Sequence, residues 1–361
     1  MADDQIQADR IDLAALRAWM DAQDLGAGQP VENLTPLAGG TQNVMVRFDR
    51  GGRSFVFRRG PWSLRPRSND QLRQEMKVLA ALASTNVPHP GLIAACPDER
   101  VMGDAVFYLM EPVDGFNATV TLPDYHASSA EVRHAMGLAA VDALALLGAV
   151  DHVAVGLGDV GKPDGFLERQ VPRWLSELDG YAKHDGYPGP AIPGLDDVAR
   201  WLESNLPASS FRAGLSHGDF HLANLMYRYD SPEVAAIVDW EMVTVGDPLL
   251  DLGWLLATWP EDGAFSVAGT LAAAGGLPTG SELVARYAQR SDRDVSSVAW
   301  YEVLACFKLG IVLEGTHARA CAGKAPKSIG DLLHATTLGL FARALRRIDD
   351  DCAGDVLPAS R

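Results

Sequence analysis

The chain has 361 residues and a mass of 38.7 kDa, enough for one large domain or for two smaller domains that each have a core. Apolar residues make up 47% and charged residues 22% of it, as in ordinary globular proteins, which excludes a fibrous or wholly disordered chain. The formal net charge of −16 argues against nucleic acid or an anionic membrane as the main partner.

The charge is unevenly distributed. The first 110 residues contain 12 basic and 13 acidic side chains, whereas the rest contain 19 basic and 34 acidic ones. The first third of the chain is therefore expected to hold a site that needs arginine.

Targeting and redox signals indicate a soluble cytoplasmic protein. The sequence begins MADDQ without an apolar run behind it, so no secretory signal is expected. The most apolar stretch, Gly137–Val150, contains Asp142 and is too short to span a bilayer. The four cysteines are far apart and form no CxxC pair, which fits a reducing compartment and neither a disulfide framework nor a zinc site.

The first third is expected to form a small sheet with helices. In chain order, the pattern predicts a helix capped by Asp12 that ends near Gly26, a hairpin of Val44–Phe48 and Ser54–Arg58 joined by DRGG, a helix over Asn69–Ala83 and a strand over Val106–Met110.

Beyond Glu111 the pattern is mainly helical, with strands only at Leu225–Tyr227 and Val234–Val238. Pro172 requires the second predicted helix to start late or to kink. The expected helices are Ala130–Val150, Phe166–Ala182, Leu195–Asn205, Asp247–Thr258, Ser281–Gln289, Val295–Ala322 and Gly330–Ile348.

These elements predict an α+β protein with two lobes and a hinge near Glu111–Gly115. The expected divisions are an N-terminal helical extension at 1–29, a small lobe at 30–110, a larger lobe at 111–348, and a flexible tail at 349–361.

The densest polar cluster lies in the segment LSHGDFHLANLMY, residues 215–227. His217, Asp219 and Asn224 follow the spacing H-x-D-x-x-x-x-N, and Asp239 ends the apolar run AAIV. Asn224 precedes one predicted strand and Asp239 follows the next, so both are expected at the same end of a hairpin. Carboxylate and amide oxygens suit phosphoryl transfer, in which one carboxylate accepts the hydroxyl proton and the others hold Mg²⁺.

Other interpretations of these residues stay open. Asp219 and Asn224 can be turn formers, and Asp239 a helix cap. His217, Asp219 and His221 also form H-x-D-x-H, a pattern of metal-dependent hydrolases, although no other histidine has a matching spacing. His217 is expected to brace the loop, whereas His221 can reach a substrate or face solvent.

The first third supplies a complementary set. The segment LAGGTQN, with Gly39, Gly40, Thr41 and Asn43, precedes the hairpin and can fold over a nucleotide with its backbone amides near phosphate. Arg58 ends the second hairpin strand, and Glu75 follows on the next helix. A cation on a strand that faces a carboxylate on a helix is the ion pair with which kinases position phosphates.

Two further carboxylates follow Asp239 in the run GDPLLDLGW. Asp247 precedes Pro248 as helix caps do, and Asp251 lies one turn later, where it can bond back to the catalytic loop. Both are expected to be structural.

The order of these motifs resembles the aminoglycoside phosphotransferase and choline kinase-like superfamily, which has the protein-kinase fold. RRGP, LERQVPRW at 167–174 and VDWEMVTVGDPLLDLGWLLATW at 238–259 are similar to the branch whose kinase domains accompany acyl-CoA dehydrogenases. The resemblance covers about residues 30–345 and implies a small β-rich lobe and a larger helical lobe.

The resemblance also implies roles. Asp219 would be the catalytic base and Asn224 and Asp239 the magnesium ligands. Arg58 would bind phosphate where most kinases have lysine, with Glu75 as its partner. The hinge, comprising Met110, Glu111 and Val113, would contact adenine. Asp239 is followed by Trp-Glu and no activation segment, which favours a small-molecule acceptor over a protein.

The sequence thus predicts an ATP- and Mg²⁺-dependent kinase that acts on a hydroxylated small molecule. A hydroxyacyl-CoA-like metabolite and an aminoglycoside both remain possible acceptors, and an ATP-binding scaffold without turnover is the alternative from another class. ATP versus GTP preference, the oligomeric state and any ligand contact of the basic residues in 59–73 stay open.

Overall fold

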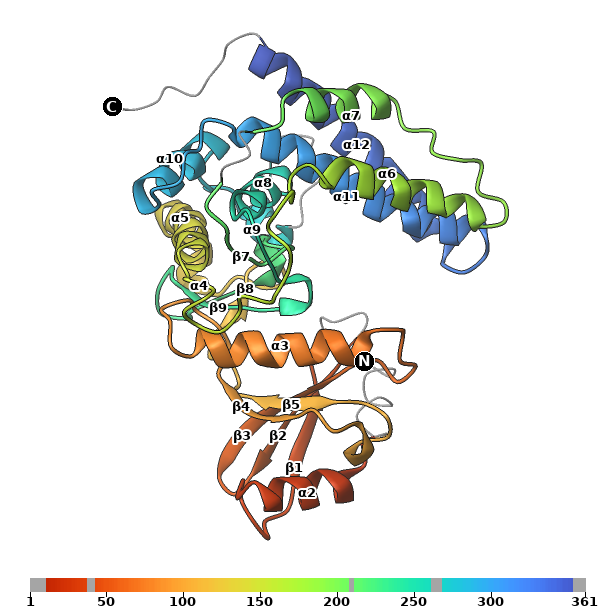
Figure 1. Cartoon of the computed structure of the whole chain (residues 1–361). Helices are drawn as coiled ribbons and strands as arrows, with labels where there is room; N and C mark the ends of the chain where they lie inside the picture. Colours follow the sequence, from red (N-terminus) through yellow and green to blue (C-terminus); the bar gives the residue numbers. More distant parts are fainter. Residues whose placement is uncertain (1–10, 38–42, 208–210, 261–267, 353–361) are drawn as a thin grey trace. The chain divides into compact units, whose positions relative to one another are not determined.

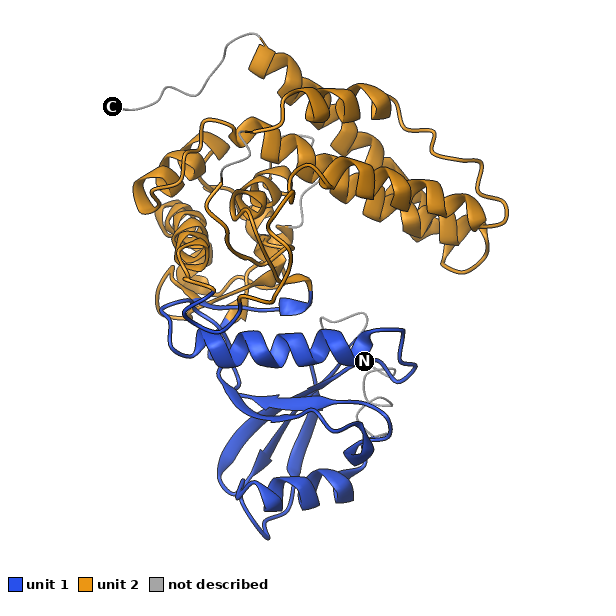
Figure 2. Cartoon of the chain, viewed as in Figure 1, with its two compact units in different colours: residues 1–115, 153–157, 235–241 blue, residues 116–152, 158–234, 242–361 orange. Residues whose placement is uncertain are grey.

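A computed structural model of the chain describes residues 11–37, 43–207, 211–260 and 268–352. The chain divides into two compact units, which Figure 2 shows in blue and orange. Unit 1 contains residues 1–115, 153–157 and 235–241, and unit 2 contains residues 116–152, 158–234 and 242–361. The sequence assigned 111–348 to one lobe, whereas the segment 235–241, which carries Asp239, groups with unit 1.

Unit 1 is built on an antiparallel sheet of five strands in the order β1-β2-β3-β5-β4. The predicted hairpin is confirmed as β2 and β3, which pair from Val44 opposite Arg59 to Arg50 opposite Arg53. Its turn residues Gly51 and Gly52 have φ values of 57° and 77°, a conformation that favours glycine. The strands are β1 (Glu32–Pro36), β2 (Val44–Arg50), β3 (Arg53–Arg59), β4 (Leu92–Cys96) and β5 (Phe107–Met110).

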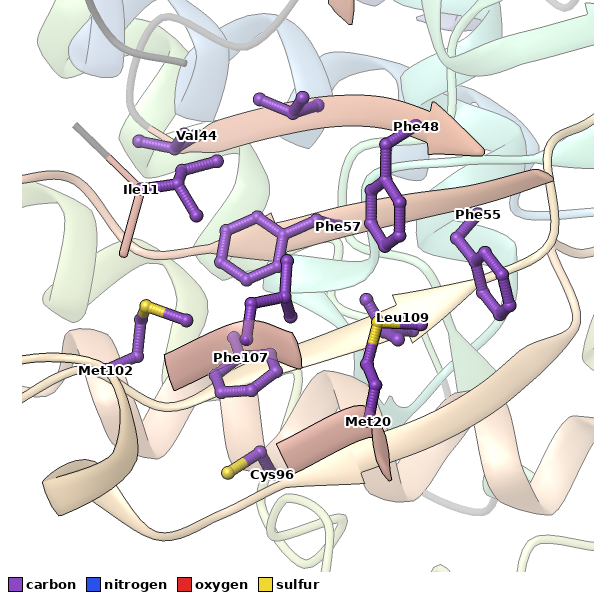
Figure 3. Packing of buried hydrophobic residues seen from close by; sticks show 12 residues of the cluster. Ile11, Met20, Val44, Phe48, Phe55, Phe57, Cys96, Met102, Phe107 and Leu109 are labelled. Carbon is purple, nitrogen blue, oxygen red and sulfur yellow. The ribbon is translucent and has the colours of Figure 1, made fainter. Parts of the chain in front are cut away.

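Helices α2 (Leu13–Ala22) and α3 (Ser68–Leu82) lie on opposite faces of this sheet (Figure 1). Leu16 of α2 belongs to the same buried cluster as Phe57 of β3. Figure 3 shows Phe57 among the other aromatic side chains of this cluster. The next residue of β3, Arg58, instead bonds to Glu75 of α3. Because side chains alternate between the faces of a strand, the two helices must cover different faces. The predicted N-terminal extension thus contributes to the core of unit 1.

Unit 2 is mainly helical, and its long helix α11 packs along α12 and α8 (Figure 1). The predicted helices are present, but α6 begins at Gln170 instead of Phe166, which leaves Pro172 in the first turn, where proline is tolerated. The helices are α4 (Asp124–Ala127), α5 (Ala130–Gly148), α6 (Gln170–Asp179), α7 (Leu195–Ser204), α8 (Leu249–Ala257), α9 (Gly269–Ala274), α10 (Gly280–Arg290), α11 (Val298–Cys321) and α12 (Lys327–Cys352). Residues 349–352 of the predicted tail continue α12, and residues 353–361 lie outside the described residues.

Polar side chains accept hydrogen bonds from backbone N–H groups at the starts of three helices. Asp12 accepts hydrogen bonds from two amides in the first turn of α2 at 3.0 and 2.9 Å. Thr279 and Glu282 form a reciprocal capping box at the start of α10. Asp247 accepts from the backbone N of Leu249 at 3.0 Å, as expected of a residue that caps α8.

Of the short strands in unit 2, the sequence predicted Leu225–Tyr227 but not the strands at Phe116–Asn117, Gly214–Ser216 and Thr244–Gly246. It also did not predict β1 and β4 of unit 1 or the short helices α4 and α9. β7 (Gly214–Ser216) pairs with β10 (Thr244–Gly246), and β6 (Phe116–Asn117) pairs with β8 (Leu225–Tyr227). Segments of two or three residues are too short to show alternation, so partners distant in the chain determine them. The remaining elements are strand β9 (Val234–Ile237) and the 3₁₀ helices η1 (Glu99–Val101), η2 (Gly180–Lys183), η3 (Leu222–Asn224) and η4 (Trp240–Met242).

None of the helices within the described residues is long and apolar enough to cross a membrane.

Candidate functional site

Arg58 is a buried cation in unit 1, with 5% of its surface exposed. Its Nε donates to Glu75 Oε2 at 2.9 Å and its Nη2 to Glu75 Oε1 at 3.2 Å, so strand β3 and helix α3 are joined by a bidentate ion pair. Burial acts to lower the pKa of Arg58, but the charges of Glu75 and Asp239 raise it above its ordinary value. The contact that the sequence predicted is present, and the guanidinium is held charged.

The same guanidinium reaches a second carboxylate. Nη2 of Arg58 also donates to Asp239 Oδ1 at 3.0 Å, and the Asp239 side chain is 36% exposed. Asp239 follows β9 with a φ of 68°, in the left-handed region that only a few non-glycine residues adopt. Residues held in such conformations concentrate at functional sites, because the surrounding structure must maintain them.

Tyr108 and Glu241 complete this cluster in unit 1. The Tyr108 hydroxyl donates to Glu75 Oε2 at 2.9 Å, and burial and the Glu75 charge raise the pKa of Tyr108 well above its ordinary value. Burial and the neighbouring Asp239 charge likewise raise the pKa of Glu241. Tyr108 is therefore a neutral donor that fixes Glu75.

The cluster carries more negative than positive charge. It contains one guanidinium, that of Arg58, and three carboxyl groups, those of Glu75, Asp239 and Glu241. Of the two carboxylates that bond to Arg58, that of Asp239 is the more exposed to solvent. An additional cation at Asp239 would balance this charge, and a carboxylate oxygen is the donor that Mg²⁺ prefers. Asp239 therefore fits a role as a magnesium ligand.

The predicted phosphate loop is only partly described. Gly39, Gly40 and Thr41 lie outside the described residues. Asn43, at the start of β2, donates through Nδ2 to Glu241 Oε2 at 3.4 Å. This contact connects the end of the loop to the carboxylate cluster of unit 1.

The predicted hinge residues follow β5. Met110 is the last residue of that strand, where it is buried and pairs with Val56. The backbone N of Glu111 donates to the Gly91 carbonyl at 2.8 Å, and its exposed side chain accepts from Arg53 at 3.2 Å. The backbone amide and the side chain of Glu111 thus both have partners within unit 1.

In unit 2, the segment between β7 and β8 brings Asp219 and Asn224 together. Nδ2 of Asn224 lies 2.9 Å from the Asp219 carbonyl and 3.1 Å from Asp219 Oδ2. Since the amide nitrogen is committed to Asp219, the Asn224 amide oxygen is the atom that can ligate a cation. The structure thus pairs Asp219 with Asn224 and, in unit 1, Asp239 with Arg58.

Asp251 of α8 holds the backbone of this loop. Its Oδ2 accepts from the backbone N of His217 at 2.6 Å and its Oδ1 from that of Gly218 at 2.8 Å. Gly218 has a φ of 84°, and a Cβ at this position would lie 2.4 Å from the Met242 carbonyl oxygen. The predicted structural role of Asp251 is confirmed, and only glycine fits at position 218.

Asp219 is oriented by two side chains besides Asn224. Its Oδ1 accepts from Trp254 Nε1 at 2.9 Å and lies 3.3 Å from His221 Nε2. Burial acts to raise the pKa of Asp219, but the hydrogen bond and charge of His221, with smaller contributions from His217 and Lys308, lower it below its ordinary value. Asp219 is therefore ionised at neutral pH, and His221 contacts it instead of projecting into solvent.

Lys308 of α11 is a second cation that the sequence did not single out. Its Nζ donates to the Gly218 carbonyl at 3.1 Å and lies 4.4 Å from the centre of the Trp254 ring and 5.6 Å from that of Trp174. Burial lowers the pKa of Lys308 below its ordinary value, and Asp219 partly opposes that effect. A lone lysine in the apolar run VLACFKLGIV was the signal that could have identified it.

The metal-hydrolase interpretation of His217, Asp219 and His221 gains no support. Within the described part of the chain, three ligand atoms close enough to hold one ion come from Glu314, His317 and His334, and not from the H-x-D-x-H segment. The single contact between His221 and Asp219 is instead that of an orienting side chain.

Comparison with known families agrees with this arrangement. The sequence model of the phosphotransferase enzyme family matches residues 33–288. A crystal structure of a Ralstonia eutropha protein, provisionally named an aminoglycoside phosphotransferase, is 28% identical and superposes with a TM-score of 0.76 over 93% of this chain and 99% of its own. The GDP complex of aminoglycoside 2′-phosphotransferase-IIIa is 14% identical with a TM-score of 0.61, over 94% of this chain and 99% of its own, which shows a shared fold alone.

Curated relatives are longer proteins that are named as acyl-CoA dehydrogenase family members. Acyl-CoA dehydrogenase family member 11 of Homo sapiens is 30% identical over 325 residues, which are 87% of this chain and 40% of that protein. Acyl-CoA dehydrogenase family member 10 of Mus musculus is 28% identical over 79% of this chain and 26% of its own length. The chain therefore spans two fifths or less of these two relatives.

Proposed function

Because the chain belongs to the phosphotransferase enzyme family, we propose that it transfers the γ-phosphate of ATP, with Mg²⁺, to a hydroxyl group of a small molecule. The observation that carries this proposal is the buried Arg58, which is fixed by Glu75 and reaches the half-exposed Asp239. A second solved phosphotransferase, 14% identical with a TM-score of 0.57, was crystallised with ADP and hygromycin B, which supports a nucleotide as the phosphate donor.

Arg58 is proposed to bind the phosphates of the nucleotide. Its guanidinium is permanently charged and presents several N–H donors in a fixed plane, which suits phosphate oxygens. Glu75 and Tyr108 hold the group in one orientation before the nucleotide binds. Asn43 and the glycines of the preceding loop are proposed to approach the same phosphates.

Asp239 and Asn224 are proposed as the magnesium ligands, each on the basis of its own surroundings. Asp239 lies where its cluster has excess negative charge, and Asn224 keeps its amide oxygen available. When bound, the ion would neutralise charge on the phosphate oxygens during transfer.

Asp219 is proposed to receive the proton of the acceptor hydroxyl. Its carboxylate is ionised, and Trp254, His221 and Asn224 restrict its rotation. Phosphoryl transfer depends mainly on positioning and charge, so a weakly basic but well-oriented carboxylate is sufficient. The hydroxyl oxygen would then form the new P–O bond to the γ-phosphorus while the bond to the β–γ bridging oxygen breaks, ADP leaves and the hydroxyl proton passes to Asp219.

The surroundings of Asp219 in unit 2 favour an acyl-derived acceptor. Lys308 approaches the rings of Trp254 and Trp174, and Arg173 lies 5.2 Å from the Trp174 ring. Lys308 and the Trp254 indole beside the base suit an uncharged or anionic acyl compound better than a polycation. The similarity to acyl-CoA dehydrogenase family members supports the same choice, a hydroxyacyl-CoA-like metabolite.

An aminoglycoside is the second candidate acceptor. The observation in its favour is the excess of 15 acidic over basic side chains in residues 111–361, which would attract a polycation at long range.

Release of ADP, followed with a panel of hydroxyacyl-CoAs and aminoglycosides including hygromycin B, tests the proposal. We expect Mg²⁺-dependent turnover with a hydroxyacyl-CoA, and a loss of roughly 10²- to 10⁴-fold in kcat for Asp219→Asn with ATP affinity retained. Asp230→Asn, which alters an exposed turn residue, is the matched control and should match the wild type. If the wild type binds MgATP but phosphorylates no hydroxylated acceptor, the chain is a nucleotide-binding scaffold.

A further inference from the structure

The outer end of the α11–α12 hairpin holds a cluster of ligand-type side chains outside the proposed phosphotransfer residues. Glu314 and His317 are one turn apart near the end of α11, so they share one face of that helix, and His334 lies in the early part of α12 (Figure 1). One potential ligand atom from each of the three residues lies within 4.8 Å of the other two. The helix pairing therefore brings one carboxylate and two imidazoles to one place.

Glu314 is unusual because its carboxylate is fully buried, with 0% of its surface exposed. The Tyr187 hydroxyl donates to its Oε1 at 2.8 Å, and His334 Nδ1 lies 2.7 Å from its Oε2. Burying a carboxylate is unfavourable unless hydrogen bonds or a positive charge compensate for it. Tyr187 and His334 each contact one oxygen of Glu314, and a bound cation would add a positive charge beside the carboxylate.

The second histidine is less well satisfied. The His317 ring stacks on the His334 ring with 4.5 Å between centroids and 24° between planes, and its buried Nδ1 has no hydrogen-bond partner among the described residues. Its Nε2 lies 3.7 Å from Sγ of Cys321, one turn further along α11. His317 thus has Nδ1 without a partner and Nε2 beside a thiol. These surroundings are more typical of a metal-ligating histidine than of a histidine packed in a core.

We propose that Glu314, His317 and His334 bind a divalent transition-metal ion of the zinc type, with Cys321 as a fourth donor. Two nitrogen donors with one oxygen and one sulfur suit zinc and its neighbours, whereas magnesium and calcium prefer sets of oxygens. The wide cysteine spacing indicated no zinc site because two of these ligands are histidines and one is a glutamate.

Binding requires only local side-chain movement. Zinc–nitrogen distances of about 2.0–2.1 Å place tetrahedral ligand atoms roughly 3.3 Å apart, so the separations among Glu314, His317 and His334, which lie within 4.8 Å, must change by up to about 1.5 Å. Cys321 is not part of this group and must move further to become the fourth donor. One of the stacked rings must also turn, because parallel rings do not aim their lone pairs at one point. Both rings are partly exposed, and Cys321 is exposed, so this rotation does not disturb the core. Tyr187 already orients Glu314 through Oε1, whereas Oε2 must exchange its contact with His334 Nδ1 for the ion.

Zinc titration of the chelator-treated full chain against a chromophoric zinc indicator tests the site. We expect one tight equivalent in the wild type and a loss of roughly 100-fold or more in affinity for His317→Ala and for His334→Ala, since even residues that only support ligands change affinity by about 10–100-fold. His134→Ala is the matched control, because His134 contacts Glu282 at 3.2 Å without a second histidine. Its affinity should equal that of the wild type, and Mg²⁺ in excess should not displace the zinc.

The cobalt(II) spectrum of the wild type provides a readout that needs no variant to fold. Intense visible bands are expected from a four-coordinate ion, together with a thiolate-to-metal charge-transfer band that Cys321→Ser removes while the metal stays bound. Absence of zinc uptake by the wild type, or unchanged uptake by the His317→Ala/His334→Ala double variant, would overturn the proposal. Uptake with a six-coordinate cobalt spectrum would also contradict it. None of these outcomes depends on phosphotransfer, so the two proposals can fail separately.

Discussion

Arg58 in unit 1 and Lys308 in unit 2 are both cations drawn into the protein, but they are held in different ways. Arg58 is bonded directly to the carboxylates of Glu75 and Asp239, and these charges raise its pKa against the effect of burial. Lys308 is held by a backbone carbonyl and the face of Trp254, and burial lowers its pKa. Arg58 therefore carries a permanent charge in a rigid ion pair, whereas the pKa of Lys308 is lowered by its surroundings.

This difference matches the two proposed tasks. A group that binds phosphates must stay charged at every physiological pH, which an arginine between carboxylates does. A group beside the proposed base needs only to lower the pKa of Asp219, and the charge of Lys308 does this through space. The largest expected effects therefore come from breaking the ion pair, and smaller effects from altering the surroundings of Lys308.

Arg58→Met should destabilise the protein most. It leaves Glu75, which is 1% exposed, buried without its cation, and removing one partner of a buried pair costs about 3–5 kcal/mol. Denaturant unfolding would measure the loss, and nucleotide affinity should fall with it. The matched control is Arg53→Met, which breaks the exposed pair with Glu111 and should change stability little. Equal effects of the two substitutions would mean that burial does not distinguish these pairs.

Lys308→Met should act mainly on turnover. We expect a decrease in kcat of roughly 10- to 100-fold from misplacement of the loop that carries Asp219. Lys308 helps to lower the pKa of Asp219, so its removal should raise that pKa and shift the acid limb of the kcat–pH profile to higher pH. Lys327→Met, at an exposed position on α12, is the control. An unshifted acid limb would remove Lys308 from the electrostatics of Asp219.

The contribution of Lys308 to the stability of the wild type depends on pH with a defined sign. Because the pKa of Lys308 is lowered in the folded state, the unfolded chain binds more protons between that value and the ordinary 10.5, and stability rises with pH across this interval. Below the folded-state pKa the lysine is charged in both states, and its burial is most unfavourable. Unfolding free energies of the wild type should therefore rise relative to Lys308→Met as pH increases toward 10.5.

The sequence was sufficient for the ion pair but not for the lysine. Arg58 and Glu75 are 17 residues apart on a strand and the helix that follows it, so their order along the chain predicted the contact. Asp251 was likewise predicted to bond back to the loop that contains His217. Lys308 is 90 residues from Gly218, and nothing local in an apolar helix determines whether a lysine extends to solvent or is folded beneath a distant loop.

The same limit applies to the metal-type cluster and the short strands. The spacing of Glu314 and His317 on one helix face was visible in the sequence, but their proximity to His334 depends on how α11 and α12 pair. β7 and β10 are three residues each and exist because they pair with each other. Tertiary contacts decided these features, and single-sequence periodicity does not contain them.

Trp254→Phe should have the smallest effect and separates the two ways in which Trp254 serves the loop. Phenylalanine keeps an aromatic face toward Lys308 but removes the N–H that donates to Asp219 Oδ1 at 2.9 Å. Loss of one such bond corresponds to ~1 kcal/mol, or about fivefold in kcat. Since the substitution removes a hydrogen bond but no charge, the acid limb of the kcat–pH profile should move less than that of Lys308→Met. If both variants shift the limb equally, the indole hydrogen bond contributes as much as the lysine charge to the ionisation of Asp219.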